Sequence, residues 1–387
     1  MLKSYKIFYL LLFALLCCRK PYNPPAVKNN NNYLVVEGVI NTGTDSTSFK
    51  LSRTINLSAG IAANPETGAM VTVESNANTS YPLTETKPGY YTSAGLNLDM
   101  TKQYRLQITT TDNQQYLSDF VAVKPTPPID SVGYIVQSNG IQLYVNTHDP
   151  NNNTHYYRWD YTETWNFHAQ YETAFITNGK TLQLRTPAQQ IFTCFANDTA
   201  STITLGSTAK LSKDIVLQQP ITQVVSTSEK IETKYSILVR QYALTNDAYS
   251  WWTFLKKNTE QLGSIFDAQP STVRGNIHCT TNPSEPVIGY ISVTNVQQKR
   301  IFITNAQLPQ AWMPVYPYQC QLDSALFCRG AACAQNDVAL FILPLNPSEF
   351  ALSPIITNGA FLGYVAADAQ CTDCTIRGTT VQPPFWQ

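Results

Sequence analysis

The sequence predicts a mostly β protein, with an N-terminal immunoglobulin-like sandwich and a second β-rich domain that carries one amphipathic helix and a Cys-rich C-terminal region. Three observations support this prediction. Short β-branched and aromatic runs recur at regular spacing, with turn residues between them. Charged residues make up only 13% of the chain, whereas 43% are hydrophobic, including 22 Tyr and 16 Phe. Every cysteine except Cys17 and Cys18 lies in the second half of the chain.

Residues 1–17 are predicted to be a signal peptide. Lys3 and Lys6 form a basic start, and the apolar run that follows is too short to span a bilayer. The run ends at Cys18 with a pattern similar to a bacterial lipoprotein signal, in which a small residue directly precedes the lipidated cysteine. Cys17 fits this pattern less well because bulky Leu16 precedes it.

We therefore expect cleavage before Cys18 and a lipid on Cys18 that holds the protein on a membrane. The alternative is a plain secretory peptide that is cleaved elsewhere. Residues 18–32 then form a lipidated tether, because three prolines favour extended chain and the run Asn29–Asn32 cannot bury apolar surface.

Residues 33–128 are predicted to form the immunoglobulin-like β-sandwich, with a barrel as the alternative. The clearest strand patterns are at 33–40, 49–53, 70–74, 89–93 and 104–110. Turn signals such as Asn64-Pro65 and Asp112-Asn113 separate them. Three prolines between Lys124 and Pro128 indicate a linker at the end of this domain.

Residues 129–387 are predicted to form the second domain, in which an aromatic strand spans residues 156–165. A period of two places five residues on one face of that strand, namely Tyr157, Trp159, Tyr161, Glu163 and Trp165. A carboxylate among buried aromatic rings needs a partner. We expect a core ion pair with Arg240, or otherwise Arg300. The alternative is a Glu163 carboxylate that faces a ligand.

A helix is predicted near residues 246–262. Ala248, Trp251 and Leu255 follow helical spacing, and Trp252 broadens the apolar stripe. Gly263 is suited to the position just after the helix. We interpret the paired tryptophans as packing against a sheet, with a sugar platform as the alternative. Further along the chain, the apolar run at 338–343 predicts a strand.

Seven cysteines remain after Cys17 and Cys18, and we expect them to form disulfides in an oxidising compartment. They are Cys194, Cys279, Cys320, Cys328, Cys333, Cys371 and Cys374. An odd number leaves one thiol over. A four-thiolate zinc site built from the last four is the alternative.

No motif predicts an enzyme, a cofactor or a metal site. His-Glu-x-x-His, Gly-x-Ser-x-Gly and a Gly-rich phosphate loop are absent, and the four histidines lack metal-ligand spacing. Asp149 begins a sequence similar to a calcium loop, but Thr154 replaces the required glycine, so an ordinary hairpin turn is expected. The formal net charge of +0 gives no reason to expect nucleic acid.

Several segments together resemble the Bacteroidota lipoproteins of domain-of-unknown-function family 4249. They are Arg19–Pro24, Leu34–Gly38, Tyr157–Trp165, Tyr235–Tyr242, Gly275–Ile277, Ile288–Tyr290, Lys299–Phe302, Cys371–Cys374 and Pro384–Trp386. One departure is Phe195 after Cys194, where the family often has tryptophan. The resemblance brings no catalytic residues to carry over.

The resemblance implies outer-membrane lipoproteins that sit beside TonB-dependent transporters. We therefore expect a non-catalytic accessory or ligand-binding partner of such a transporter, anchored through the lipid on Cys18. The alternative is a surface adhesin or structural interaction module. The sequence leaves open whether the protein faces the periplasm or the cell surface.

Overall fold

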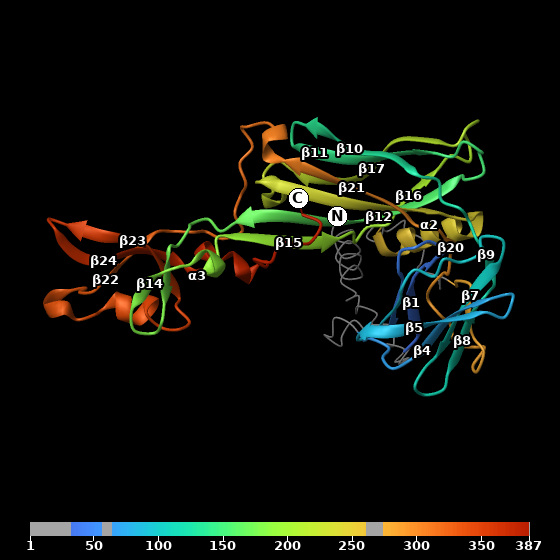
Figure 1. Cartoon of the computed structure of the whole chain (residues 1–387), viewed down its shortest axis with the longest axis horizontal. Coiled ribbons are helices and arrows are strands. Elements are labelled where there is room, and N and C mark those ends of the chain that lie inside the picture. Colours follow the sequence, from blue (N-terminus) through green and yellow to red (C-terminus); the bar gives the residue numbers. More distant parts are fainter. Residues whose placement is uncertain (1–31, 56–63, 261–273, 387) are drawn as a thin grey trace, which may run out of the picture.

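The computed structural model describes residues 32–55, 64–260 and 274–386 (Figure 1). The predicted signal peptide, Cys18 and Gly263 lie outside the described residues, as does the tether except for Asn32. Within the described part the mostly β prediction is confirmed. No helix in that part is both long and apolar enough to cross a membrane.

The N-terminal part of the chain forms a β-sandwich of two sheets that share strand β5, as predicted. The strands are β1 (Leu34–Gly38), β2 (Ile40–Asn41), β3 (Thr47–Arg53), β4 (Met70–Ser75), β5 (Ser80–Lys87), β6 (Tyr90–Ser93), β7 (Gln103–Thr109), β8 (Gln115–Ser118) and β9 (Val121–Ala122). Strand β5 pairs with β4 on one side and with β6 on the other. Alternating residues such as Phe49, Leu51, Val71 and Val73 are buried in its core.

The single domain boundary predicted at residue 128 does not separate the two domains completely, because residues 277–294 return to the N-terminal sandwich. Strand β19 (Ile277–Cys279) extends the sheet beside β8, and β20 (Val293–Thr294) pairs in parallel with β2. Ile291 is fully buried in the sandwich core. These short segments give no local signal of the pairing, because β19 lies about 160 residues from β8 and β20 about 250 residues from β2.

The second domain packs a three-stranded sheet against a five-stranded sheet. The first contains β10 (Ile129–Gln137), β11 (Gly140–His148) and β17 (Ile215–Val225). The second, here called the central sheet, contains β12 (Tyr156–His168), β15 (Thr193–Thr199), β16 (Thr204–Ser207), β18 (Lys234–Ala243) and β21 (Gln297–Thr304). The predicted alternation along β12 is confirmed, because its odd-numbered aromatic residues face the core between the sheets.

Buried hydrogen bonds join the two domains where the chain passes between them. The Thr126 hydroxyl accepts from the backbone amide of Ala243 in the central sheet at 3.0 Å and lies 2.5 Å from the Thr294 hydroxyl in the N-terminal sandwich. The Gln241 amide donates to the carbonyl of Pro127 at 2.8 Å and accepts from the Trp159 indole at 2.9 Å. A fully bonded buried polar network specifies one arrangement of its groups, so the junction holds the domains in a fixed relation.

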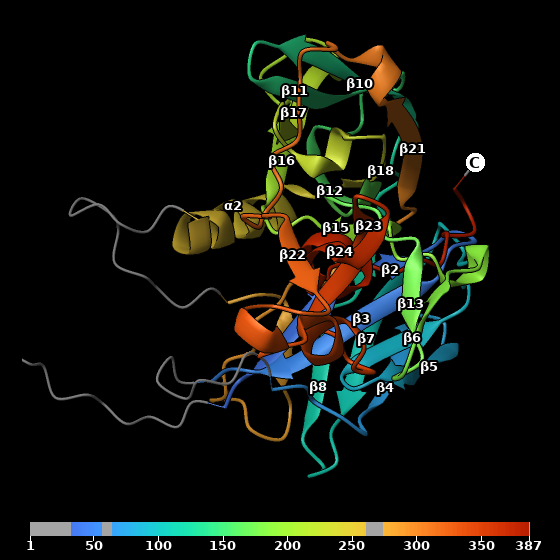
Figure 2. The same cartoon turned by 90° about the vertical axis from the view of Figure 1, so that its left-hand side faces the viewer.

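The predicted helix begins at Asn246 as expected and is described as far as Glu260 (α2, Asn246–Glu260). Figure 2 shows α2 at the level where the N-terminal sandwich meets the second domain. The only other α-helix in the described part is α3 (Ala369–Thr372). Shorter helical turns lie at Pro187–Gln189, Glu229–Ile231, Asn305–Gln307, Ala331–Cys333, Val338–Ile342 and Cys374–Ile376.

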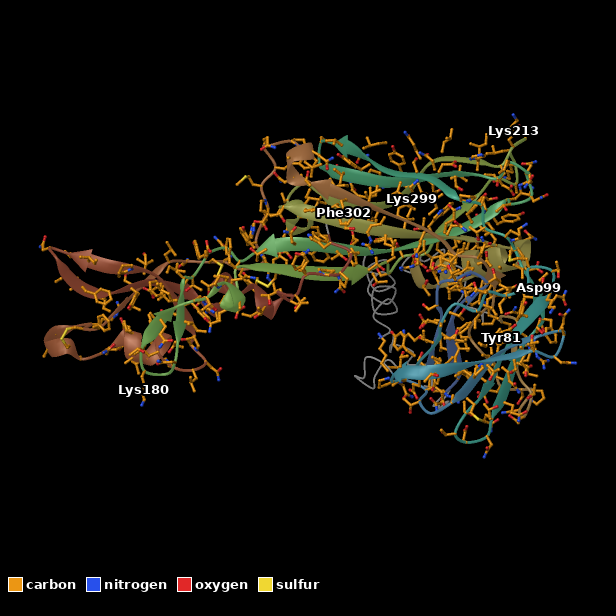
Figure 3. All side chains as sticks on the ribbon, in the orientation of Figure 1. Tyr81, Asp99, Lys180, Lys213, Lys299 and Phe302 are labelled. Carbon is orange, nitrogen blue, oxygen red and sulfur yellow. A yellow bond between two sulfur atoms is a disulfide. The ribbon has the colours of Figure 1, made fainter. Side chains whose placement is uncertain are left out.

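A C-terminal lobe projects away from the two domains (Figure 1). It contains β22 (Asp323–Leu326), β23 (Glu349–Thr357) and β24 (Ala360–Asp368), together with the hairpin β13 (Phe175–Thr177) and β14 (Leu182–Leu184). Figure 3 shows Lys180 at the tip of this hairpin. The strand predicted at 338–343 is wrong, because Val338–Ile342 forms one helical turn that buries only its ends. A short apolar run does not distinguish a strand from a buried helical turn.

Three disulfides lie in the second half of the chain, as expected from its cysteines. They join Cys194 to Cys374, Cys320 to Cys371 and Cys328 to Cys333. The zinc alternative is therefore wrong, since all four of its thiolates are in disulfides. The inclusion of Cys279 among the candidate disulfide cysteines is corrected, because Cys279 is a free and buried thiol in the N-terminal sandwich.

We expect a chain that starts after Cys18 to contain one free thiol. Thiol titration of the unreduced, denatured protein should find about one equivalent, and the native protein should react far more slowly because Cys279 is 2% exposed. Three or more equivalents in denaturant would contradict the three disulfides. Reduced protein provides the control, with seven thiols.

Candidate functional site

Glu163 belongs to the core of the second domain, and the prediction that Arg240 is its ion-pair partner is wrong. Its carboxylate pairs with Lys230 and accepts a hydrogen bond from the Tyr235 hydroxyl at 2.5 Å. The residue is 3% exposed. Burial and the charge of Glu163 raise the pKa of Tyr235 well above its ordinary value, so Tyr235 stays protonated and donates.

Strand register explains where Arg240 lies instead. In the pairing of β12 with β18, Arg240 is directly opposite Asp160, whereas Glu163 is opposite Ile237. Residues directly opposite each other in a sheet point to the same face. Asp160 points to the outer face of the central sheet, and Arg240 Nε donates to its Oδ1 at 2.6 Å. Arg300, the other candidate partner, instead donates to the Ser236 hydroxyl.

The outer face of the central sheet forms one wall of a cleft between the two domains, here called the interdomain cleft. Its volume is about 570 Å³. The other walls come from β1, α2, the segment at 288–290 and the loop at 199–203. Its lining includes the aromatic residues Tyr90, Tyr242, Trp251, Trp252 and Tyr290 and the charged residues Glu37, Lys50, Arg158, Asp160 and Arg240.

The Arg158 guanidinium lies over two aromatic rings in this cleft. Its guanidinium carbon lies 4.1 Å from the ring centre of Tyr242 and 4.5 Å from that of Trp252. Its Nε is buried without a hydrogen-bond partner among the described residues, and its Nη2 lies 3.5 Å from Asp160. Stacking favours the cation and fixes the plane of the guanidinium without using its donors.

Contacts from α2 hold the loop that forms the cleft rim. Lys256 Nζ donates to the carbonyl of Ile203 at 2.6 Å, and the amide of Ile203 donates to Glu260 at the same distance. Trp251 is mostly buried and packs against Trp252 and Tyr290, with ring centres 4.9 Å and 5.8 Å away. The tryptophan pair therefore both packs the helix and lines the cleft.

The chemistry of this cleft suits binding. Asp160 lies 2.6 Å from the Arg240 guanidinium and 3.5 Å from that of Arg158. Burial and the nearby charge of Asp160 raise the pKa of Tyr242 to about 12, so its hydroxyl stays neutral at physiological pH. General acid–base catalysis needs groups that change protonation near the working pH. These residues instead offer fixed charge, aromatic faces and hydrogen bonds.

A second hollow, of about 600 Å³, lies on the N-terminal sandwich and is more polar. Its central Arg53 donates to Glu66 at 2.5 Å and lies 3.4 Å from Glu285. The Tyr116 hydroxyl donates to the same Glu285 at 2.8 Å. Arg53 already has two carboxylate partners, so its guanidinium is less available to a ligand than that of Arg158.

The loop that begins at Asp149 is a turn, but it is not the expected hairpin turn, because the flanking strands β11 and β12 lie in different sheets. Its carboxylate accepts the backbone amides of Asn151, Asn153 and Thr154 at 2.9–3.0 Å. Across the ranges that the structure describes, no three His, Cys, Asp or Glu residues are grouped so as to hold a metal ion.

The alternation predicted for residues 156–165 leaves Arg158 and Asp160 on the face opposite the aromatic residues, but it does not identify them as a site. The available signal was two opposite charges at alternate positions of a strand in a chain with few charges. The cleft itself is built from segments far apart in the sequence, such as β1, β12 and α2. Their meeting follows from the return of residues 277–294 to the N-terminal sandwich.

The comparisons with known proteins identify a family. No curated protein matches the chain. The model of the family described as Domain of unknown function (DUF4249) matches residues 19–300, which include the N-terminal sandwich, the sheets of the second domain except the end of β21, and the interdomain cleft. Most of the C-terminal lobe and the chain's last segment, which packs on the central sheet, lie beyond the match. The match covers well over half of the chain, and the protein therefore belongs to the DUF4249 family.

Proposed function

We propose that this protein is a non-catalytic lipoprotein of the outer membrane that binds a ligand in the interdomain cleft and acts beside a TonB-dependent transporter. The observation that carries the proposal is the cleft itself. It combines a stacked arginine with an aromatic wall, and buried hydrogen bonds fix the two domains that enclose it. A preformed concave site with few oriented polar groups is typical of ligand binding.

Two further observations support an envelope location. The three disulfides fit an oxidising compartment. The N-terminal sequence carries the lipoprotein pattern at Cys18. A lipid there would hold the sandwich near the membrane, with the described chain starting 14 residues later at Asn32.

The anchor gives a direct prediction. Cys18→Ala should abolish fatty-acid labelling and leave the protein soluble or unprocessed, because the lipid is the proposed membrane attachment. Metabolic labelling followed by membrane fractionation measures this, with Cys17→Ala as the matched control. Undiminished label in the Cys18 variant would contradict the lipoprotein proposal, and loss of label only in the Cys17 variant would move the anchor by one residue.

The transporter association is tested by purification from native membranes in mild detergent. A tagged chain should bring down a TonB-dependent barrel in near-stoichiometric amount, and the Cys18→Ala variant should lose it. Recovery of the chain from the membrane without any such barrel would favour the alternative, a surface adhesin or structural interaction module. The apolar side chains exposed on the C-terminal lobe, including Leu340, Leu345 and Phe361, are the feature that suits that alternative.

A further inference from the structure

We infer that the interdomain cleft binds a small organic anion, with a carboxylate of the ligand held at Arg158 and an apolar face of the ligand against the aromatic wall. This inference rests on the proposed function, because it takes the cleft as the binding site and names the chemistry of its ligand.

The first argument is the balance of charge in the cleft. Arg158 and Arg240 share the single carboxylate of Asp160. Lys50 lies 2.8 Å from Glu37, so that pair is neutral. On the rim, Lys256 lies 3.8 Å from Glu260 and is likewise matched. One positive charge therefore remains uncompensated in the lining.

The uncompensated charge is concentrated at Arg158. Arg240 holds Asp160 at 2.6 Å and also donates to the Thr162 hydroxyl, whereas the nearest approach of Arg158 to Asp160 is 3.5 Å. The Arg158 side chain is only 17% exposed. Burying a cation with an incomplete partner costs free energy, which an anion in the cleft would offset. A guanidinium that contacts two ring faces keeps its N–H donors for a carboxylate, which it can bind through two parallel hydrogen bonds.

The second argument is the surface beside this charge. Trp251, Trp252 and Tyr290 present ring surface to the cleft. The Trp251 indole N–H is buried without a partner in the part of the chain that the structure describes. Thr199, Ser201 and Thr202, whose side chains carry hydroxyls, also line the cleft. The cleft therefore matches an anion whose body has an apolar face and hydrogen-bonding groups.

Acidic sugars and aromatic acids share this chemistry, and four probes distinguish them. The full mature chain in detergent is titrated with D-glucuronate and phenylacetate and with their uncharged counterparts D-glucose and 2-phenylethanol. Intrinsic fluorescence reports binding, because Trp251 and Trp252 line the cleft. We expect saturable binding of at least one acid, about tenfold or more tighter than its counterpart. Binding of D-glucuronate identifies the ligand class as acidic sugars, and binding of phenylacetate identifies it as aromatic acids.

Two variants test whether Arg158 causes the preference of the cleft for an acid over its uncharged counterpart. Arg158→Gln should weaken binding of the acid by about tenfold or more and leave the uncharged counterpart unchanged. The matched control is Arg105→Gln, which removes an arginine that also stacks on a ring and pairs with a carboxylate, but in the N-terminal sandwich. Asp160→Asn should act in the opposite direction and tighten binding of the acid, which keeps the inference testable if the Arg158 variant fails to fold.

Equal binding of acids and uncharged counterparts, or unchanged acid binding by Arg158→Gln, would overturn the inference while leaving a binding site in the cleft. Absence of saturable binding by both acids would also overturn it. The proposed function is judged separately by recovery of the barrel from native membranes, which does not depend on these probes.

Discussion

Replacing both Cys194 and Cys374 with alanine is expected to lower the free energy of unfolding by about 3–5 kcal/mol. The disulfide joins residues 180 apart in the sequence, and such a long loop loses much entropy in the unfolded chain when it is closed. Both sulfurs are fully buried between β15 and the final segment of the chain. The loss therefore includes packing in the core of the second domain as well as the cross-link.

The same change should release the end of the chain from the central sheet. Thr379 exchanges two backbone hydrogen bonds with Phe195, and Trp386 packs edge-on against Phe195 and Phe302. Denaturant unfolding measures the loss of stability, and limited proteolysis should cut the variant after Cys371. The control is alanine at both Cys328 and Cys333, which are 5 apart, with an expected loss of about 2 kcal/mol or less. Equal losses in both variants would contradict the argument.

Glu163→Gln is expected to destabilise the protein by about 2–3 kcal/mol. The change keeps the size of the side chain and an acceptor for Tyr235 but removes the charge that pairs with Lys230. Breaking a fully buried pair costs about 3–5 kcal/mol. The cost here is smaller because Lys230 is 24% exposed and lies 3.5 Å from Asp198, so it is not left without a counter-charge.

Denaturant unfolding of single and double variants tests this pair. Asp198→Asn is the matched control, since it removes the exposed partner of the same lysine, and it should change stability by less than about 0.5 kcal/mol. Probe binding should survive in Glu163→Gln, because Glu163 faces the core and the cleft lies on the opposite face of the sheet. Wild-type stability combined with lost binding would show that Glu163 contacts a ligand.

The local parts of the fold could be predicted from the sequence. Alternation along residues 156–165 correctly placed Glu163 among buried aromatic residues, and the helical stripe correctly placed the start of α2. Both patterns depend only on neighbours in the chain. The partner of Glu163 was not predictable in this way, because it depends on the register between β12 and β18 and on the turn that carries Lys230.

The candidate site was less predictable for the same physical reason. Arg158 can be identified as a site residue only once Tyr242 and Trp252 are known to contact its guanidinium, and these two residues come from two other elements. The cysteines show the limit clearly. Their number implied one unpaired thiol, but only the return of β19 to the N-terminal sandwich identifies Cys279, which lies in the core of that sandwich.

The return of residues 277–294 to the N-terminal sandwich also determines the order in which the parts of the protein can fold. Synthesis and export proceed from the N-terminus, so the first domain to emerge lacks β19, β20 and the buried Ile291 until about three-quarters of the whole chain has emerged. Until then β8 has an unpaired edge, which can pair with another chain. The domain nearest the proposed anchor would thus be completed late, and a truncated product that stops before residue 277 should aggregate rather than yield a stable N-terminal fragment.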